Sequence, residues 1–361
     1  MAPQLTRADV LAFRVRAQQL DRTAGTLSDT AVLDLGVQDT GADAGRWALA
    51  VRGVADVDGA DLALVWTLRG APHLYRRADL PGVAAATAPF SDADAGKRIF
   101  DAVKPLKAAG IPALTALDTV AATMREVVTV PTVKGEMSRQ LTERLDPPYL
   151  RHCRPCNAVH VHEQPFRLAA LRAGLELQPD TSPPVLRPVP GFRAAETVPG
   201  HLDVVRGYLR LHGPATPQQV AGYLDAPVAE VKARWPDDAV EVSVDGERRW
   251  VLADDVDLLG ADPVRTTRLL GPFDPYLQTR DRSLLVPDEA RAKDLWRVLG
   301  RPGGVLVDGE VVGTWRPRKT GRRLTVQVHL WRDVPRAPLE QEAQRLAAVR
   351  GTESAAVDLG G

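Results

Sequence analysis

The sequence predicts an α+β protein in which helix-turn-helix units precede a strand-rich C-terminal element. Residues 202–252 contain three short apolar helical patterns, then two alternating segments joined by an Asp-Gly turn. This order is the winged form of helix-turn-helix, a fold that binds nucleic acid or, less often, protein. Beyond Asp255 the hydrophobic period changes from helical spacing to alternation, as in residues 304–307 and 324–331. The 361 residues suffice for several such units.

The first unit is expected in residues 1–86. Residues 6–20 form an amphipathic pattern with Val10, Phe13 and Ala17 inward, and with Arg14 and Arg16 outward. The further elements expected here are a short helix at 29–35, a Gly- and Asp-rich loop at 36–45, a helix or strand at 47–54, and short strands at 62–68 and 73–75.

A second helix-helix-strand unit is expected in residues 87–195. Its first part, residues 87–145, has mostly helical patterns, and the last of these helices exposes Lys134, Arg139 and Arg144 as a mostly cationic stripe. Residues 153–163 are expected to be extended. A Pro-rich joint at 179–190 leads to the third unit.

The third unit, residues 196–258, is the winged helix of residues 202–252. Its first helix should end at Gly213-Pro214, Thr216 should cap the second, and the third should begin at Pro227. The outward face of this third helix has mixed charge, which is unfavourable for phosphate contacts and keeps a protein-binding role open. The C-terminal element, residues 259–361, should contain strands around an Asp308-Gly309 turn and end in a frayed tail over its last ten residues.

Charge must be segregated if the chain binds nucleic acid, because 46 Lys and Arg balance 46 Asp and Glu. One loop next to Trp315 concentrates positive charge with no acidic residue between, and it is the strongest candidate for phosphate contact, the alternative being a solvated basic hairpin. Its members are Arg316, Arg318, Lys319, Arg322 and Arg323. No apolar run approaches a membrane span of about 18 residues. The N-terminus lacks a signal core, so cytoplasmic residence is expected.

Four segments, in order along the chain, resemble one protein family: residues 36–40 (GVQDT), 68–74 (LRGAPHL), 270–276 (LGPFDPY) and 308–315 (DGEVVGTW). Over residues 5–335 the chain resembles the AlkZ/YcaQ-type winged-helix DNA glycosylases of bacteria. The resemblance implies three tandem winged helices in a C-shape plus a C-terminal β-barrel-like element, with duplex DNA in the channel. It also implies cleavage of the N-glycosidic bond of bulky or crosslinking N7-alkylpurines, which in several family members protects antibiotic producers from their own product.

The resemblance places the catalytic signature, Gln, an apolar or small residue, then Gln or Asp, on Gln38, Asp39 and Thr40. Gln38 would orient the water and Asp39 or Thr40 would assist. Thr40 departs from the signature, since a hydroxyl can hold a water but is no base at neutral pH. The alternative is an ordinary turn in which Asp39 or Thr40 accepts backbone N–H groups. His73 matches a family histidine that would hold DNA or the loop; it could equally be a satisfied histidine at a strand end.

These residues are chemically sufficient for an N7-alkylguanine, which is already cationic and leaves without a strong acid. No lysine adjoins the motif, so a Schiff-base lyase step is disfavoured and a monofunctional glycosylase is expected. No cofactor is expected. The expected partner is double-stranded DNA carrying alkylated purines, bound by a monomer associated with the nucleoid. The rival hypothesis is a non-catalytic DNA-binding protein, either a regulator or a damage binder.

Cys153 and Cys156, followed by His160 and His162 four and six residues after Cys156, form a pattern that could hold zinc. A zinc-stabilised interaction module is therefore a third hypothesis. Because the resemblance implies no metal and the histidines follow the cysteines closely, reduced buried cysteines without metal are the favoured interpretation.

Overall fold

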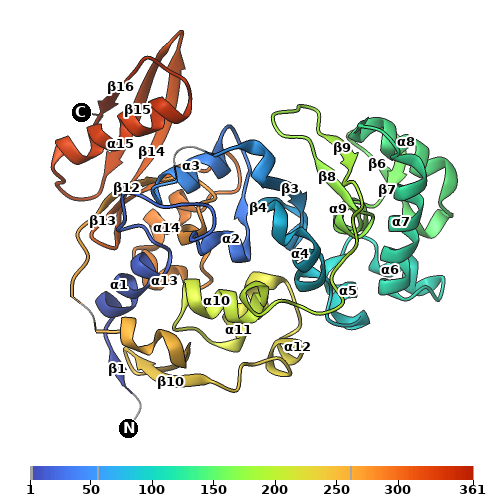
Figure 1. The fold of residues 1–361 in the computed structure, drawn as a ribbon, viewed down its shortest axis with the longest axis horizontal. Helices are drawn as coiled ribbons and strands as arrows, with labels where there is room; N and C mark the ends of the chain where they lie inside the picture. Colours follow the sequence, from blue (N-terminus) through green and yellow to red (C-terminus); the bar gives the residue numbers. More distant parts are fainter. Residues whose placement is uncertain (1–2, 55–56, 261, 361) are drawn as a thin grey trace. The chain divides into compact units, whose positions relative to one another are not determined.

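The computed structural model describes residues 3–54, 57–260 and 262–360, which form two compact units. Unit 1 comprises residues 1–57, 205–223 and 235–361, and unit 2 comprises residues 58–204 and 224–234. Helices and strands occur together in both units, which confirms the α+β class (Figure 1). The division into three winged helices and a C-terminal element stays a prediction. In the described ranges no helix combines the length and the apolar character needed to cross a bilayer.

Unit 1 is built from three stretches of sequence. Its helices, which lie wholly or mainly in the unit, are α1 (Arg7–Ala17), α2 (Val32–Leu35), α3 (Ala44–Ala50), α10 (Val204–His212), α11 (Pro217–Leu224), α13 (Arg282–Leu285), α14 (Glu289–Leu295) and α15 (Arg336–Val349). Its strands are β1 (Gln4–Leu5), β2 (Val37–Gln38), β10 (Ala239–Val244), β11 (Glu247–Leu252), β12 (Thr267–Leu270), β13 (Gly303–Val307), β14 (Glu310–Thr320), β15 (Arg323–Leu330) and β16 (Ser354–Asp358).

Helix α1 begins at a capping box. The Thr6 backbone N–H donates to the Asp9 carboxylate (2.8 Å), and the Asp9 N–H donates to the Thr6 hydroxyl (3.3 Å). Val10 and Phe13 are fully buried, which confirms the predicted apolar face. The outward placement of Arg14 is wrong: its side chain is 1% exposed and pairs with a buried carboxylate.

The elements predicted for residues 202–252 are present. Helix α10 ends at His212, directly before Gly213-Pro214. Thr216 and Gln219 exchange side-chain and backbone hydrogen bonds at the start of α11 (2.8 and 3.3 Å), which confirms the predicted cap. After α12 (Val228–Lys232), β10 and β11 form an antiparallel hairpin, and β1 pairs parallel with β10 through Gln4 and Ser243. The N-terminal strand thus joins the β10–β11 hairpin, which comes much later in the chain.

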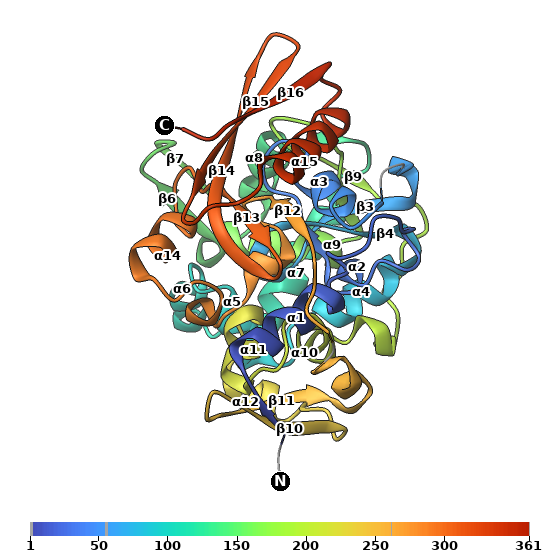
Figure 2. The same cartoon turned by 90° about the vertical axis from the view of Figure 1, so that its left-hand side faces the viewer.

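The C-terminal part of unit 1 is a five-stranded sheet in the chain order β12-β13-β14-β15-β16, as predicted for a strand-rich element. Asp308 and Gly309 connect β13 to β14 with φ of 51° and 87°, which suits the predicted tight turn. Figure 2 shows the long β14 and β15 side by side, with α15 nearby. The predicted frayed tail is wrong, because β16 pairs parallel with β15 over Ser354–Asp358.

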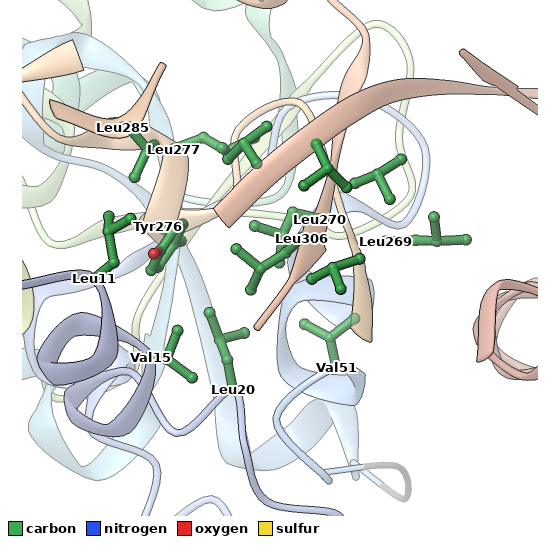
Figure 3. Close-up of a cluster of buried hydrophobic side chains, with 14 of the residues drawn as sticks. Leu11, Val15, Leu20, Val51, Leu269, Leu270, Tyr276, Leu277, Leu285 and Leu306 are labelled. Carbon is green, nitrogen blue, oxygen red and sulfur yellow. The ribbon is translucent and has the colours of Figure 1, made fainter. Parts of the chain in front are cut away.

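Apolar side chains from distant segments form the core of unit 1. In Figure 3, Leu11 of α1 lies beside Tyr276, and Leu306 of β13 lies beside Leu270. All of these side chains are buried. Apolar contacts with the C-terminal segment, rather than with neighbours in sequence, therefore position helix α1.

Unit 2 has its own sheet, in which β4 (Pro72–Arg76), β3 (Leu62–Trp66), β8 (Leu175–Leu177), β9 (Val185–Pro188) and β5 (Thr132–Val133) are neighbours in this order. A separate hairpin consists of β6 (Leu150–Cys153) and β7 (Ala158–Val161). The further helices of the unit are α4 (Leu80–Thr87), α5 (Asp92–Arg98), α6 (Val103–Ala108), α7 (Ala113–Val127), α8 (Lys134–Arg144), α9 (Glu163–Arg172) and α12. The predicted helical content of residues 87–145 is confirmed, and the extended chain predicted after Cys153 is interrupted by a turn.

A buried ionic cluster holds α1 to the segment after Gln278. Asp281 accepts from Arg14 (2.7 Å) and from Arg249 (2.5 Å), and the side chains of Arg14 and Asp281 are 1% and 4% exposed. Burial opposes ionisation of Asp281, but the charge and hydrogen bonds of Arg14, the Thr279 hydroxyl and the Arg249 charge together outweigh it and hold the pKa of this carboxyl at about 2, below its ordinary value of 3.8. Asp281 is thus the carboxylate that pairs with both buried guanidinium groups, those of Arg14 and Arg249.

Replacing Asp281 by Asn should lower the free energy of unfolding by about 3–5 kcal/mol at pH 7, because it leaves buried guanidinium charge uncompensated. The native pKa is depressed, so this stabilisation is complete above the unfolded pKa and is lost as the pH falls from about 4 towards 2. Urea unfolding at several pH values should show the difference between the two proteins shrinking over that window. Glu247→Gln is the matched control, since Glu247 pairs with the same Arg249 but is 73% exposed and should matter by less than about 1 kcal/mol. A pH-independent difference would contradict the assignment.

Candidate active site

The side-chain amide of Gln38, the last residue of β2, is hydrogen-bonded at both ends, by Thr40 of the following loop and by Gln278. The Gln38 Nε2 donates to Thr40 Oγ1 (3.0 Å), and the Gln38 Oε1 accepts from Gln278 Nε2 (2.8 Å). The three side chains are half-buried, so solvent can still reach them. A carbonyl oxygen has two lone pairs, and the bond from Gln278 uses one. Gln38 can therefore accept one further hydrogen bond in a defined direction.

Gln278 is a site residue that the sequence analysis missed. It ends the short 3-10 helix η7 (Pro275–Gln278), and its second amide hydrogen is donated to Phe273 O (3.2 Å). The available signal was its position two residues after the LGPFDPY segment, one of the four segments that carried the resemblance. Nothing in that segment's pattern indicates which residue 240 positions earlier it contacts.

Asp39 lies at the amino end of α3. Its Oδ1 accepts from the backbone N–H of Gly45 (2.8 Å), in the first turn of this helix. A carboxylate in this place is stabilised by the helix dipole and by the unpaired N–H groups of the first turn. The backbone-bonding alternative considered for Asp39 is therefore realised in the structure, and its carboxylate belongs to the residue directly between Gln38 and Thr40.

The segment that carries Gln278 is anchored by a buried ion pair. Arg52, which follows α3, makes a two-pronged contact with Asp274 (2.8 and 2.9 Å), and both side chains are 0% exposed. Asp274 also caps η7 by accepting from Tyr276 N (2.9 Å), and Tyr276 donates its hydroxyl proton to Gly309 O (2.8 Å). Burial raises the pKa of Tyr276, so its phenol stays protonated and keeps this bond.

His73 is inside unit 2, on β4. Its side chain is 1% exposed, and Nδ1 lies 2.9 Å from Ala71 O and 3.0 Å from Thr67 Oγ1. Burial, together with the Arg69 guanidinium, lowers the pKa of His73 to about 3, so the ring is neutral at physiological pH. This environment favours the satisfied histidine at a strand end over a direct contact with phosphate.

The cationic stripe predicted on α8 is largely neutralised. Lys134 pairs with Glu163 (2.8 Å), and Arg139 pairs with Glu136 and Glu143 (2.6 and 2.5 Å). The sequence analysis placed these cations correctly on an exposed helix but did not identify their acidic partners.

The basic loop next to Trp315 forms the exposed tip of the hairpin β14–β15. Arg316 is half-buried and donates to Gly300 O (2.6 Å), while Arg322 pairs with Glu353 (2.8 Å) at the surface. Arg318, Lys319 and Arg323 are exposed, and no carboxylate of the described residues lies within 4.0 Å of their cationic nitrogens. These three side chains are the positive charges at this tip that remain available to a phosphate backbone.

The hairpin β6–β7 brings together three metal-binding side chains. Cys153, Cys156 and His160 place their ligand atoms within 4.8 Å of one another. The cysteines are unpaired, with Cys153 half-buried and Cys156 exposed, so the expectation of buried cysteines is wrong. The Cys156 backbone N–H and the His160 ring lower the pKa of the Cys153 thiol to about 7. His162 is buried just beyond the hairpin and does not belong to the cluster.

Comparisons with known proteins agree on one family. A family model described as DNA glycosylase AlkZ-like matches residues 6–349. The solved structure of the Streptomyces sahachiroi DNA glycosylase AlkZ matches with a TM-score of 0.74 and 22% identity, over 99% of this chain and 100% of that one. The search of curated proteins found no match.

Proposed function

Because the chain belongs to the AlkZ-like DNA glycosylase family over residues 6–349, we propose that it hydrolyses the N-glycosidic bond of bulky N7-alkylguanine adducts in duplex DNA. The observation that carries this proposal is the fixed amide of Gln38, held by Gln278 and Thr40 with one acceptor position left over. The biological setting we propose is repair of alkylation damage, including protection of a cell that makes a DNA-alkylating natural product.

Release of an N7-alkylated guanine requires little acid catalysis from the enzyme. Alkylation at N7 gives the guanine a positive charge, so the base leaves as a neutral molecule once the glycosidic bond breaks. The sugar becomes an oxocarbenium-like cation, and a water must attack its C1′ and release a proton to the surrounding solvent. The Gln38 carbonyl accepts a hydrogen bond from that water and orients it, a contribution of positioning rather than proton abstraction. No covalent amine intermediate is needed, which agrees with a monofunctional enzyme.

Asp39 and Thr40 take different parts in this proposal. The Asp39 carboxylate, held by the Gly45 N–H, supplies negative charge near the developing sugar cation. Thr40, where the family signature has Gln or Asp, accepts a hydrogen bond from the Gln38 amide. A hydroxyl meets this requirement, so the departure at the third position is compatible with activity.

Replacing Gln38 by Ala should lower the single-turnover rate of base release by about 10²–10³-fold, because the attacking water loses its fixed acceptor. Binding of adducted duplex should be unchanged. The measurement is the yield of alkali-labile abasic sites in an N7-alkylated oligonucleotide duplex, with affinity measured separately by fluorescence anisotropy. Gln327→Ala, which removes an exposed glutamine on β15, is the matched control and should keep the wild-type rate. Release at the wild-type rate by Gln38→Ala would remove Gln38 from the mechanism; no release by the wild type would favour the non-catalytic DNA-binding protein.

Gln278 is a positioning residue in this scheme. Gln278→Ala removes one neutral hydrogen bond to Gln38, worth about 1 kcal/mol, and should lower the rate of base release about 5-fold to 10-fold without changing duplex affinity. Gln278→Glu keeps the length but cannot donate to Gln38 Oε1, so it should resemble the alanine variant. If both variants lost affinity and rate together, Gln278 would be acting on binding or folding instead.

We also propose that the β14–β15 tip contacts the DNA backbone. Replacing Arg318, Lys319 or Arg323 by Ala should each weaken binding of an undamaged duplex and reduce the slope of log K against log salt by about 1, as expected for the loss of one phosphate contact. We rank Lys134 and Arg139 as weaker contacts, so Arg139→Ala, already paired with two carboxylates, should change the slope less and serves as the comparison. Unchanged slopes in all three tip variants would exclude the tip from the interface.

A further inference from the structure

The chemistry of the hairpin β6–β7 plays no part in base release. It combines two thiols and one imidazole, Cys153, Cys156 and His160, with ligand atoms within 4.8 Å of one another. We propose that these three side chains bind a zinc ion. This inference does not rest on the glycosylase chemistry, and its test measures metal rather than activity.

The strand register explains how the three side chains meet. Cys153 pairs with Ala158 and Arg151 with His160, and cross-strand partners project from the same face of an antiparallel pair. Cys153 and Arg151 are two residues apart on β6, so Cys153 and His160 share that face. The turn between the strands, in which Asn157 takes a φ of 48°, brings Cys156 back to Cys153.

The hydrogen bond of His160 Nδ1 leaves its other ring nitrogen, Nε2, available to bind a metal ion. His160 Nδ1 lies 2.9 Å from Val161 O, a carbonyl that can only accept, so Nδ1 carries the proton of this bond. A ring that donates from Nδ1 has its lone pair on Nε2. Zinc-binding histidines characteristically have such a carbonyl or carboxylate partner, which fixes both tautomer and ring orientation.

The donor set selects zinc among the common divalent ions. Thiolates are soft ligands that Mg²⁺ and Ca²⁺ do not favour, whereas two thiolates and one imidazole suit a tetrahedral Zn²⁺ and balance its charge. Cys-x-x-Cys is the usual spacing for two thiolates on one zinc ion. Because Cys156 is exposed, the fourth position faces solvent and takes a water. The metal would close the turn and hold the two strands together.

The test is metal content of the full chain, purified without a histidine tag under reducing conditions and supplied with zinc. We expect one zinc per chain by plasma mass spectrometry after gel filtration, and Co²⁺ substitution should give thiolate-to-cobalt charge-transfer absorption with the strong visible bands of tetrahedral coordination. Cys153→Ser and His160→Ala should lose both signals. His152→Ala is the matched control, because His152 is on the opposite face of β6 in the same hairpin and should keep them.

Thermal unfolding of the wild type provides a second test that does not depend on the variants folding correctly. Chelation of the wild-type metal should lower Tm, and added zinc should restore it. Substoichiometric zinc in the wild type, or equal zinc in the wild type and both ligand variants, would overturn the proposal. So would a metal-free protein in which Cys153 and Cys156 form a disulfide, seen as a loss of two hydrogens in the intact mass.

Discussion

The ion pair between Arg52 and Asp274 is the interaction on which the candidate active site depends. Both side chains are 0% exposed, and burying two charges is costly unless every polar group finds a partner. Every N–H group of the Arg52 guanidinium has a hydrogen-bond acceptor. Its five N–H groups reach Gln18 O, Gln18 Oε1, Ala48 O and both oxygens of Asp274. One side chain therefore fixes the end of α1, the end of α3 and the start of η7 relative to one another.

This arrangement has a direct consequence for Gln38. The loop that carries it lies between α2 and α3, and Gln278 lies at the end of η7. Fixing α3 to η7 through Arg52 and Asp274 therefore also fixes the distance over which Gln278 donates to Gln38. A neutral amide has little catalytic power of its own, so its value to a reaction is its orientation. The buried charges of Arg52 and Asp274 supply this orientation through the backbone segments that they hold together.

Local patterns in the sequence predicted the elements well, because capping and alternation act over a few residues. The Thr216 cap, the Asp308-Gly309 turn and the apolar face of α1 all follow from neighbours within four positions. Arg14 was placed outward because an arginine on a helix is usually solvated. Its partner Asp281 is 267 residues away, so no local pattern could reveal that it is buried.

The candidate site shows the same limit. The resemblance identified the loop of Gln38, Asp39 and Thr40, and the structure adds the partner that no motif contained, Gln278. The C-terminal tail is another case, since β16 is a short segment whose strand pairing depends on the exposed edge of β15. For the charged surfaces, sequence located the cations on α8 and at the β14–β15 tip. The partners of Arg139, Glu136 and Glu143, lie three and four residues away on the same helix, so this pairing was open to prediction from spacing. The pairing of Lys134 with Glu163 of α9 was not, because it depends on how two helices pack.

The division into two units separates the two kinds of chemistry proposed for this chain. Gln38, Asp39, Thr40, Gln278 and the pairs that hold them belong to unit 1, which is assembled from residues 1–57, 205–223 and 235–361. The Cys153–His160 cluster belongs to unit 2. The two hydrogen bonds of the Gln38 amide are thus made within unit 1. Loss of metal from the hairpin removes neither the Thr40 nor the Gln278 hydrogen bond of the Gln38 amide. We therefore expect a fall in base release after chelation to reflect weaker DNA binding rather than a change in the orientation of the water.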